Sequence, residues 1–242
     1  MLEIWNNLVD KFILCFVEDN RWLYMVRGLG VTLEVTALSL VLGLILGIVI
    51  AAVRSFHDQQ RDQLTGVGGT LVKIANWFCK LYLTVIRGTP MMIQLMIMYF
   101  VILVNTTNKL MVAVMAFGIN SGAYVAEIVR GGIMSIDGGQ TEAARSLGLG
   151  YLQTMRLVII PQAIKNILPA LGNELITLMK ETSIVTVIGL GDLTKGATII
   201  QGRTFEAFMP LIAAALIYLL LVIFLSWLME KLERRMRAGD RR

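Results

Sequence analysis

Four stretches of the chain are uncharged, mainly apolar and long enough to cross a lipid bilayer. They contain 17 to 23 residues and lie at 35–53, 89–108, 110–126 and 207–229. An α-helix rises about 1.5 Å per residue and the hydrocarbon core of a bilayer is about 30 Å thick. Each stretch therefore predicts a membrane-spanning helix.

A fifth span is predicted at 161–190, although charged side chains interrupt this segment. The sequence PQAIKNILPALGNELITLMKETSIVTVIGLG is too apolar for a loop, and Pro161 suits the first turn of a helix. The expected fold class is therefore all-α, a polytopic membrane helical bundle with about five transmembrane helices. An odd number of spans places the two ends of the chain on opposite sides of the membrane.

Two pairs of glycines, one in the first predicted span and one in the third, indicate a tightly packed helix bundle. Gly43 and Gly47 lie one helical turn apart in the first span, and Gly118 and Gly122 are spaced in the same way in the third. Small residues at this spacing allow helix backbones to approach closely in a membrane. Glycine is also tolerated in membrane helices without a packing role, so the pairs support a tight bundle without proving it.

The composition agrees with a membrane protein and excludes an ordinary soluble domain. Of the 242 residues 56% are hydrophobic and 16% are charged, and the mean hydropathy is +0.71. Cys15, Cys79 and His57 show no spacing typical of a disulfide or a metal site, so we expect them to pack in the fold and expect no metal or cofactor. The first residues are acidic where a signal peptide is basic, so no removed leader is expected.

The distribution of basic residues predicts the orientation. The tail KLERRMRAGDRR at 231–242 contains six Lys and Arg residues, which favours a cytoplasmic position. With five spans, the segments 54–87 and 130–165 would join the tail inside, with 15 basic residues against six outside. Lys180 lies within the fourth span. The sequence thus predicts an N-terminus outside the cell and a cytoplasmic C-terminus.

The predicted cytoplasmic segment between the third and fourth spans contains a candidate docking element. Gly138 and Gly139 precede QTEAARSL, which is rich in helix-forming residues and places Ala143, Ala144 and Leu147 on one face. Gly148 and Gly150 would end or bend this helix, and YLQTMRLVII would form a second short helix before Pro161. Small side chains on one face, with Glu142 and Arg145 at the rim, suit a groove on a partner protein, although a polar connector would have a similar composition.

The same segment resembles the EAA motif of bacterial permeases of ATP-binding-cassette importers. The motif consists of EAA, three residues, Gly, nine residues, an aliphatic residue, one residue, an aliphatic residue and Pro. It is matched by Glu142, Ala143, Ala144, Gly148, Val158, Ile160 and Pro161. VTLEVT, IRGTPMMIQL, SGAYVAEIVRGGIMSI and NELITLMKETSIVTVIGLGDL are similar to the polar amino-acid branch of that family, which includes histidine, glutamine, glutamate, arginine and opine systems.

The resemblance implies a function and a set of partners. The EAA segment would be the coupling helix that seats in a separate ATPase subunit, with Glu142, Ala143, Ala144, Arg145, Gly148 and Pro161 as its residues. The other expected partners are an extracytoplasmic amino-acid-binding protein, a second permease copy or paralogue, membrane lipid and an amino-acid substrate, but no nucleic acid. No lysine is followed by Ser or Thr, so a P-loop is absent and we expect no catalytic activity in this chain. The expected location is the bacterial plasma membrane.

The fourth span carries a polar stripe that we interpret as a candidate wall of the substrate path. At about 100° per residue its members share one side of the helix: Asn173, Glu174, Thr177, Lys180 and Glu181. Charges in a membrane helix usually face the bundle interior or water. Carboxylate and ammonium groups together would suit a zwitterionic amino acid, although Glu and Lys could instead pair internally.

Other polar residues are interpreted as structural. Glu127 and Arg130 can pair along one helix face, with gating as the alternative role. Arg87, Gly88 and Pro90 predict a turn with Pro90 at a helix start.

The sequence divides into three predicted regions. Residues 1–27 are expected to form an extracytoplasmic or interfacial segment, 28–230 a permease domain with a coupling loop at 137–161, and 231–242 a basic cytoplasmic tail. The alternative function is an ion-coupled secondary transporter in which Glu127 or Glu174 relays protons. Such transporters usually have internal repeats and more spans, which are not found. The particular amino acid and the choice between homodimer and heterodimer stay open.

Overall fold

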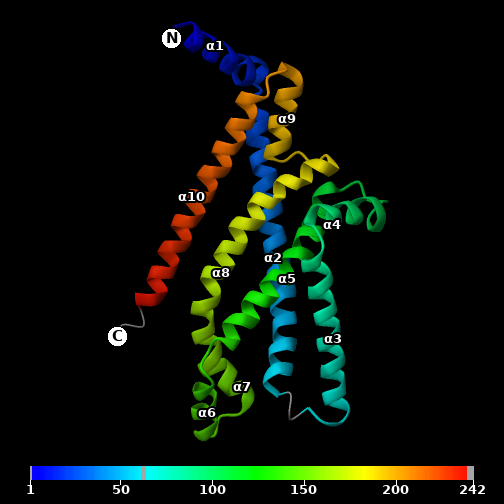
Figure 1. Ribbon diagram of the computed structural model, residues 1–242, viewed down its shortest axis with the longest axis vertical. Helices are drawn as coiled ribbons and strands as arrows, with labels where there is room; N and C mark the ends of the chain where they lie inside the picture. Colours follow the sequence, from blue (N-terminus) through cyan, green and yellow to red (C-terminus); the bar gives the residue numbers. More distant parts are fainter. Residues whose placement is uncertain (1, 61–63, 239–242) are drawn as a thin grey trace.

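The helices α2 (Trp22–Gln60) and α5 (Lys109–Met134) cross and form the centre of the molecule (Figure 1). The structure is a computed structural model that describes residues 2–60 and 64–238. At the crossing, a Cβ atom on Gly47 would lie 2.4 Å from a methyl carbon of Val125, and one on Gly118 would lie 2.6 Å from the Leu42 side chain. The close approach predicted from the glycine pairs is confirmed.

The uncharged stretch 89–108 was predicted as one span, and this prediction is wrong. The chain instead forms α3 (Gly66–Gly88), turns by 107° and continues in α4 (Met91–Ile97) with a π-helical turn (Met98–Ile102). Pro90 causes the break, because it has no N–H and holds the residue before it in an extended conformation. Thr89 has φ −120° and ψ 145°. The predicted turn and helix start at Pro90 are confirmed.

The position of α3 also changes the number of basic residues counted on the predicted inner side of the membrane. Lys73, Lys80 and Arg87 lie along a helix of 23 residues, although the sequence placed them in a cytoplasmic segment. Without these three, 12 basic residues remain on the predicted inner side against six outside, so the direction of the asymmetry is unchanged.

The second half of the bundle begins with α6 (Gly138–Ser146) and α7 (Tyr151–Thr154), followed by a π-helical turn (Met155–Ile159) and α8 (Ile160–Glu181). A 3₁₀ segment (Thr182–Ile188) ends at Gly189, whose φ is +72°. The chain then forms α9 (Leu193–Thr204) and α10 (Phe208–Ala238), which packs on α8 and α9. Residues 239–242 of the basic tail lie outside the described residues.

The N-terminal region packs at one end of the bundle, where α1 (Leu2–Phe12) lies across the top of Figure 1. A π-helical turn (Ile13–Val17) and a short 3₁₀ segment (Glu18–Asn20) lead into α2. The helix α2 starts at Trp22, so the predicted boundary between residues 27 and 28 falls inside it. Lys11 Nζ lies 2.8 Å from a carboxylate oxygen of Glu206, and this hydrogen-bonded pair holds the pKa of Glu206 below its ordinary value.

Up to five membrane spans fit the length and composition of the helices. α2, α5 and α10 can each cross alone, and two bent pairs add two more if each pair is one span: α3 with α4, and Tyr151–Ile188 with α9. No strand occurs in the described ranges 2–60 and 64–238. The all-α membrane bundle expected from the sequence is confirmed.

Candidate functional site

The helix α6 forms the tip of the molecule at the end opposite α1 (Figure 1). The Asp137 side chain starts it by accepting a hydrogen bond from the backbone N of Gly139 at 2.7 Å. The end of the helix is a Schellman motif, with bonds from Gly148 N to Arg145 O at 2.9 Å and from Leu149 N to Ala144 O at 3.1 Å. This motif needs a left-handed residue after the helix, and Gly148 has φ +82°. The predicted helix end at Gly148 is confirmed.

The exposed face of α6 differs from the predicted one. Ala144 is 4% exposed and faces the rest of the chain, whereas Glu142, Ala143 and Leu147 are exposed. Successive residues point about 100° apart on a helix, so Ala143 and Ala144 divide between the outer and inner faces. A partner would meet the outer face of Glu142, Ala143 and Leu147.

Glu142 and Arg145 lie beside a cavity of about 310 Å³ at the inner edge of α6. Its walls include Gln59 at the end of α2 and Ile159 of the π-helical turn. This cavity lies within the chain, between α6 and the ends of α2 and α5, so it does not test the predicted position of Glu142 and Arg145 at the rim of a partner's groove.

The second short helix predicted before Pro161 is not a separate element. The segment from Tyr151 continues through the π-helical turn into α8, and the backbone N of Ile160 bonds to the carbonyl of Met155 five residues earlier. A proline ring inside a helix clashes with the carbonyl four residues before it. The wider π-helical turn accommodates Pro161 and lets the helix run on, so the prediction of two short surface helices is wrong.

Two leucines near α6 are unusually exposed. Leu147 is 83% exposed and Leu152 is 78% exposed. Large exposed apolar side chains can mark a contact with another molecule, and Leu152 also lines an apolar groove beside α2. Sequence reasoning missed Leu152, whose signal was an apolar residue in the midst of a polar insertion.

The polar stripe of α8 divides into exposed and half-buried members. Asn173, Thr177 and Lys180 are exposed, whereas Glu174 and Glu181 are half-buried. Ser121 of α5 donates a hydrogen bond to Glu174 at 2.7 Å. Across the described residues no ion pair involves Glu174, so the alternative of a Glu174–Lys180 pair is not seen.

A neighbouring hydrogen bond extends this polar region to a third helix. The Asn120 amide on α5 donates to the Gln94 side chain on α4 at 3.0 Å. Gln94 also donates to the backbone of Ile86 at 2.7 Å, across the bend at Pro90. The sequence analysis did not single out Gln94, Asn120 and Ser121. Their amide and hydroxyl groups inside otherwise apolar spans could have indicated them.

A charged cluster joins the ends of α2 and α5. Arg130 bonds to Glu127 at 3.1 Å and to Asp58 at 3.4 Å, and Arg54 donates to Glu127. The predicted pair of Glu127 and Arg130 is confirmed. Because the cluster consists of paired groups on two helices, a structural bridge fits the geometry.

The chain is similar to permeases of known transport systems. Residues 66–238 match the family described as binding-protein-dependent transport system inner membrane component. The arginine transport system permease protein ArtQ of Bacillus subtilis (strain 168) is 41% identical over 225 residues, which cover 90% of this chain and 94% of ArtQ. The glutamine transport system permease protein GlnP of Escherichia coli (strain K12) is 39% identical over 219 residues, covering 88% and 93%.

Solved structures share the fold. The crystal structure of an amino acid ABC transporter with histidines has a TM-score of 0.77 and 42% sequence identity, covering 88% of this chain and 94% of that chain. An inward-facing structure of the MetNI methionine ABC transporter has a TM-score of 0.74 at 20% identity and covers 90% and 99%, which shows the fold alone.

Proposed function

The chain belongs to the family of inner membrane components of binding-protein-dependent transport systems, and we propose that it is the permease subunit of an amino-acid importer of the ATP-binding-cassette class. The observation that carries this function is the exposed, Schellman-capped helix α6 at the tip of a membrane bundle, in a chain 41% identical to an arginine permease. Membership of this family supports the proposal that an ATPase subunit and a binding protein are partners of the chain. It offers no support for the ion-coupled secondary transporter.

We propose that α6 docks in a groove of the ATPase subunit. The outer residues Glu142, Ala143 and Leu147 would make the contact, and Arg145 would contribute at the rim. Gly148 and Pro161 act on the backbone, because Gly148 ends α6 and Pro161 follows the π-helical turn inside the helix that would carry motion into the membrane. This linkage suits the transmission of force, since Tyr151–Ile188 forms one continuous helix from the docking end to the polar stripe.

We further propose that the polar stripe of α8 lines the substrate path and faces a second permease copy or paralogue. Asn173, Thr177 and Lys180 are exposed in the single chain, and exposed polar groups on a membrane helix require water or a protein partner. Glu174 would bind a substrate ammonium or guanidinium group. Arginine and glutamine systems among the relatives support a polar or charged amino acid as substrate.

The test of this function uses the permease purified with its ATPase subunits and binding protein and reconstituted in proteoliposomes. A side chain at φ +82° costs about 1–2 kcal/mol and deforms the end of α6. We expect Gly148→Leu and Glu142→Lys to insert normally but to lose bound ATPase and substrate-stimulated ATP hydrolysis.

The control is Gly131→Leu on α5, where an added Cβ meets no atom within 4 Å. This variant should retain the ATPase and hydrolyse ATP like the unmodified complex. Normal copurification and normal stimulated hydrolysis in both α6 variants would refute the coupling role.

A further inference from the structure

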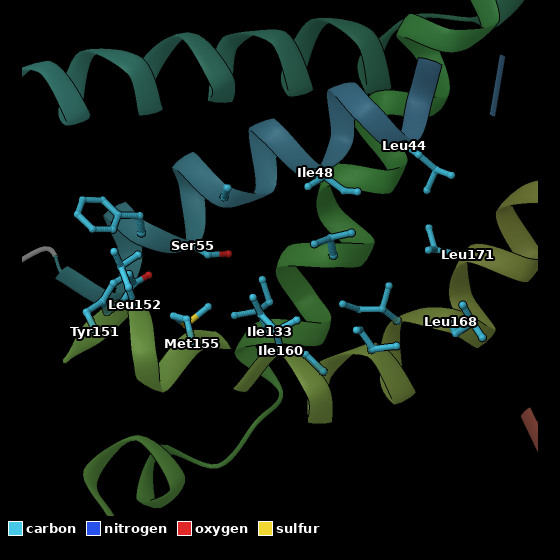
Figure 2. Close-up of a pocket in the computed structure, with 16 residues that line it drawn as sticks. Leu44, Ile48, Ser55, Ile133, Tyr151, Leu152, Met155, Ile160, Leu168 and Leu171 are labelled. Atoms are coloured by element: carbon cyan, nitrogen blue, oxygen red, sulfur yellow. The ribbon is translucent and has the colours of Figure 1, made fainter. Parts of the chain in front are cut away.

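An apolar groove opens along the membrane helices on the side where α2 and α8 face each other. Its volume is about 580 Å³, within the range of about 300–1,000 Å³ typical of ligand sites. Figure 2 shows Leu44 and Ile48 on one wall and Leu168 and Leu171 on the other, with Ile133 of α5 near Ile160 and Met155. Of its sixteen lining residues, two carry hydroxyl groups, Ser55 and Tyr151, and the others are apolar.

The exposed members of the polar stripe lie on the side of α8 opposite the groove, whereas Glu174 lies toward the groove, seven residues after Ile167. Ile160, Ile164 and Leu168 line the groove at intervals of four residues. At about 100° per residue, Asn173, Thr177 and Lys180 point about half a turn away from them. A second permease copy that packs on the stripe would therefore leave the groove open to the bilayer.

The length of the groove matches one leaflet. On α2 its lining runs from Leu44 to Phe56, which are 12 residues apart and therefore separated by about 18 Å of helix. Half of a hydrocarbon core is about 15 Å thick. A single acyl chain can therefore fill the groove, whereas a spanning helix of a partner protein would need about twice this length.

A polar atom without a partner lies at the end of the groove that is closest to α6. Ser55 is 2% exposed, and its Oγ has no hydrogen-bond partner. The Tyr151 ring meets the Phe56 ring edge-on, with centroids 5.4 Å apart, and closes this end beside Ser55. A buried hydroxyl in an apolar wall is usually hydrogen-bonded, so its partner is expected from the molecule that occupies the groove.

We propose that the groove binds one acyl chain of a glycerophospholipid from the adjacent leaflet, with an ester or phosphate oxygen of the lipid accepting a hydrogen bond from Ser55. This proposal rests on the proposed function, because that function assigns the second permease copy to the polar stripe. A bound lipid would fill the space between α2 and α8 and would leave the face of α8 that carries Asn173, Thr177 and Lys180 uncovered.

The test uses the whole transporter reconstituted in phosphatidylethanolamine vesicles that contain a phosphatidylethanolamine with a diazirine on one acyl chain. After illumination, we expect labelled peptides from 44–56 and 152–171 to exceed several-fold those from the exposed face of α10 at Leu219, Leu220 and Ile223. Ala52→Phe fills the groove and should lower its labelling about tenfold, since displacing two methylene groups at about 0.8 kcal/mol each removes about one decade of affinity. Ser55→Ala should lower it about threefold through the loss of one hydrogen bond.

Ala37→Phe is the matched control, because Ala37 and Ala52 are both exposed on α2 but Ala37 does not line the groove. It should leave the labelling unchanged. Equal labelling of groove and α10, or labelling that Ala52→Phe does not reduce, would overturn the proposal. So would a disulfide between Ile164→Cys residues of two permease copies. Substrate-stimulated ATP hydrolysis of the same preparations tests the proposed function separately.

Discussion

Glu174 is a carboxylate near the middle of a long membrane helix, and its environment decides what it can do. An ionised group without water or partners is costly in the hydrocarbon region. Ser121 supplies one hydrogen bond at 2.7 Å, whereas an ionised carboxylate can accept about four. The remaining acceptor capacity is available to a substrate cation.

We predict that Glu174→Gln weakens uptake of cationic amino acids. The amide preserves the shape of the side chain and can still accept from Ser121, but it loses the charge-assisted bond to an ammonium or guanidinium group. The substrate concentration for half-maximal uptake should rise about tenfold, the difference between a charged and a neutral hydrogen bond. Transport assays with cationic and neutral amino acids in proteoliposomes measure the effect.

Ser121→Ala serves as the control, because it removes the hydroxyl and keeps the carboxylate. It should change the half-maximal concentration less than Glu174→Gln does. If Glu174→Gln instead lowers the stability of the complex and affects all amino acids equally, the carboxylate is structural and the substrate-path assignment is wrong.

At the scale of elements, the contact between α2 and α5 depends on the absence of side chains. A Cβ atom on Gly47 would lie 2.4 Å from Val125 Cγ1 and 2.9 Å from the backbone N of Ala126. The valine can rotate, but the backbone N can only move with its helix. The cost of such overpacking is typically about 1–3 kcal/mol.

We predict that Gly47→Ala destabilises the permease by about 1–3 kcal/mol, which lowers the unfolding midpoint by about 2–4 °C for each kcal/mol. Gly30→Ala on the same helix is the control, since an added Cβ there meets no atom within 4 Å and alanine favours the helix. Thermal unfolding in detergent measures both variants. Equal midpoints for the two variants would show that α2 and α5 adjust at no cost.

The sequence predicts most helices, but fails where backbone chemistry outweighs the apolar pattern. The spans at 35–53 and 110–126 lie within helices, and α10 contains all of 207–229 except Ala207, because long uncharged runs have few alternatives in a bilayer. The run at 89–108 breaks at its start because Pro90 fixes the backbone. In the opposite direction, the helix of Tyr151 continues past Pro161, because a π-helical turn accommodates the proline ring. A hydropathy profile reveals neither the break at Pro90 nor the continuation of the helix past Pro161.

In the candidate site, the sequence likewise predicts local structure but does not predict contacts between distant residues. The EAA pattern located α6 and its end at Gly148, since these features depend on local sequence. The inward position of Ala144 depends on packing against the rest of the chain, and the bond between Ser121 and Glu174 joins residues 53 positions apart. Such contacts follow from tertiary packing, which the pattern of a single helix does not contain.

At the scale of the whole molecule, the two ends differ in the surfaces that they offer. One end carries α1, fixed by the ion pair of Lys11 and Glu206, and the loop between α9 and α10. The other end carries α6 and the exposed Leu147 and Leu152. A binding protein and an ATPase act on opposite sides of the membrane, so the direction of the bundle decides which surface meets which partner.

We predict that the α1 end faces outward and the α6 end faces the cytoplasm, as the basic residues indicate. Cys15 and Cys79 are first replaced by Ala, and single cysteines are then introduced by Ala207→Cys and Ser146→Cys, both at exposed positions. An impermeant thiol reagent added to intact cells should label the first variant at once and the second only after the membrane is opened. Both variants should retain uptake, which confirms that they are inserted and folded. The reverse order of labelling would place α6 outside, beyond the reach of an ATPase, and would refute the coupling proposal together with the orientation.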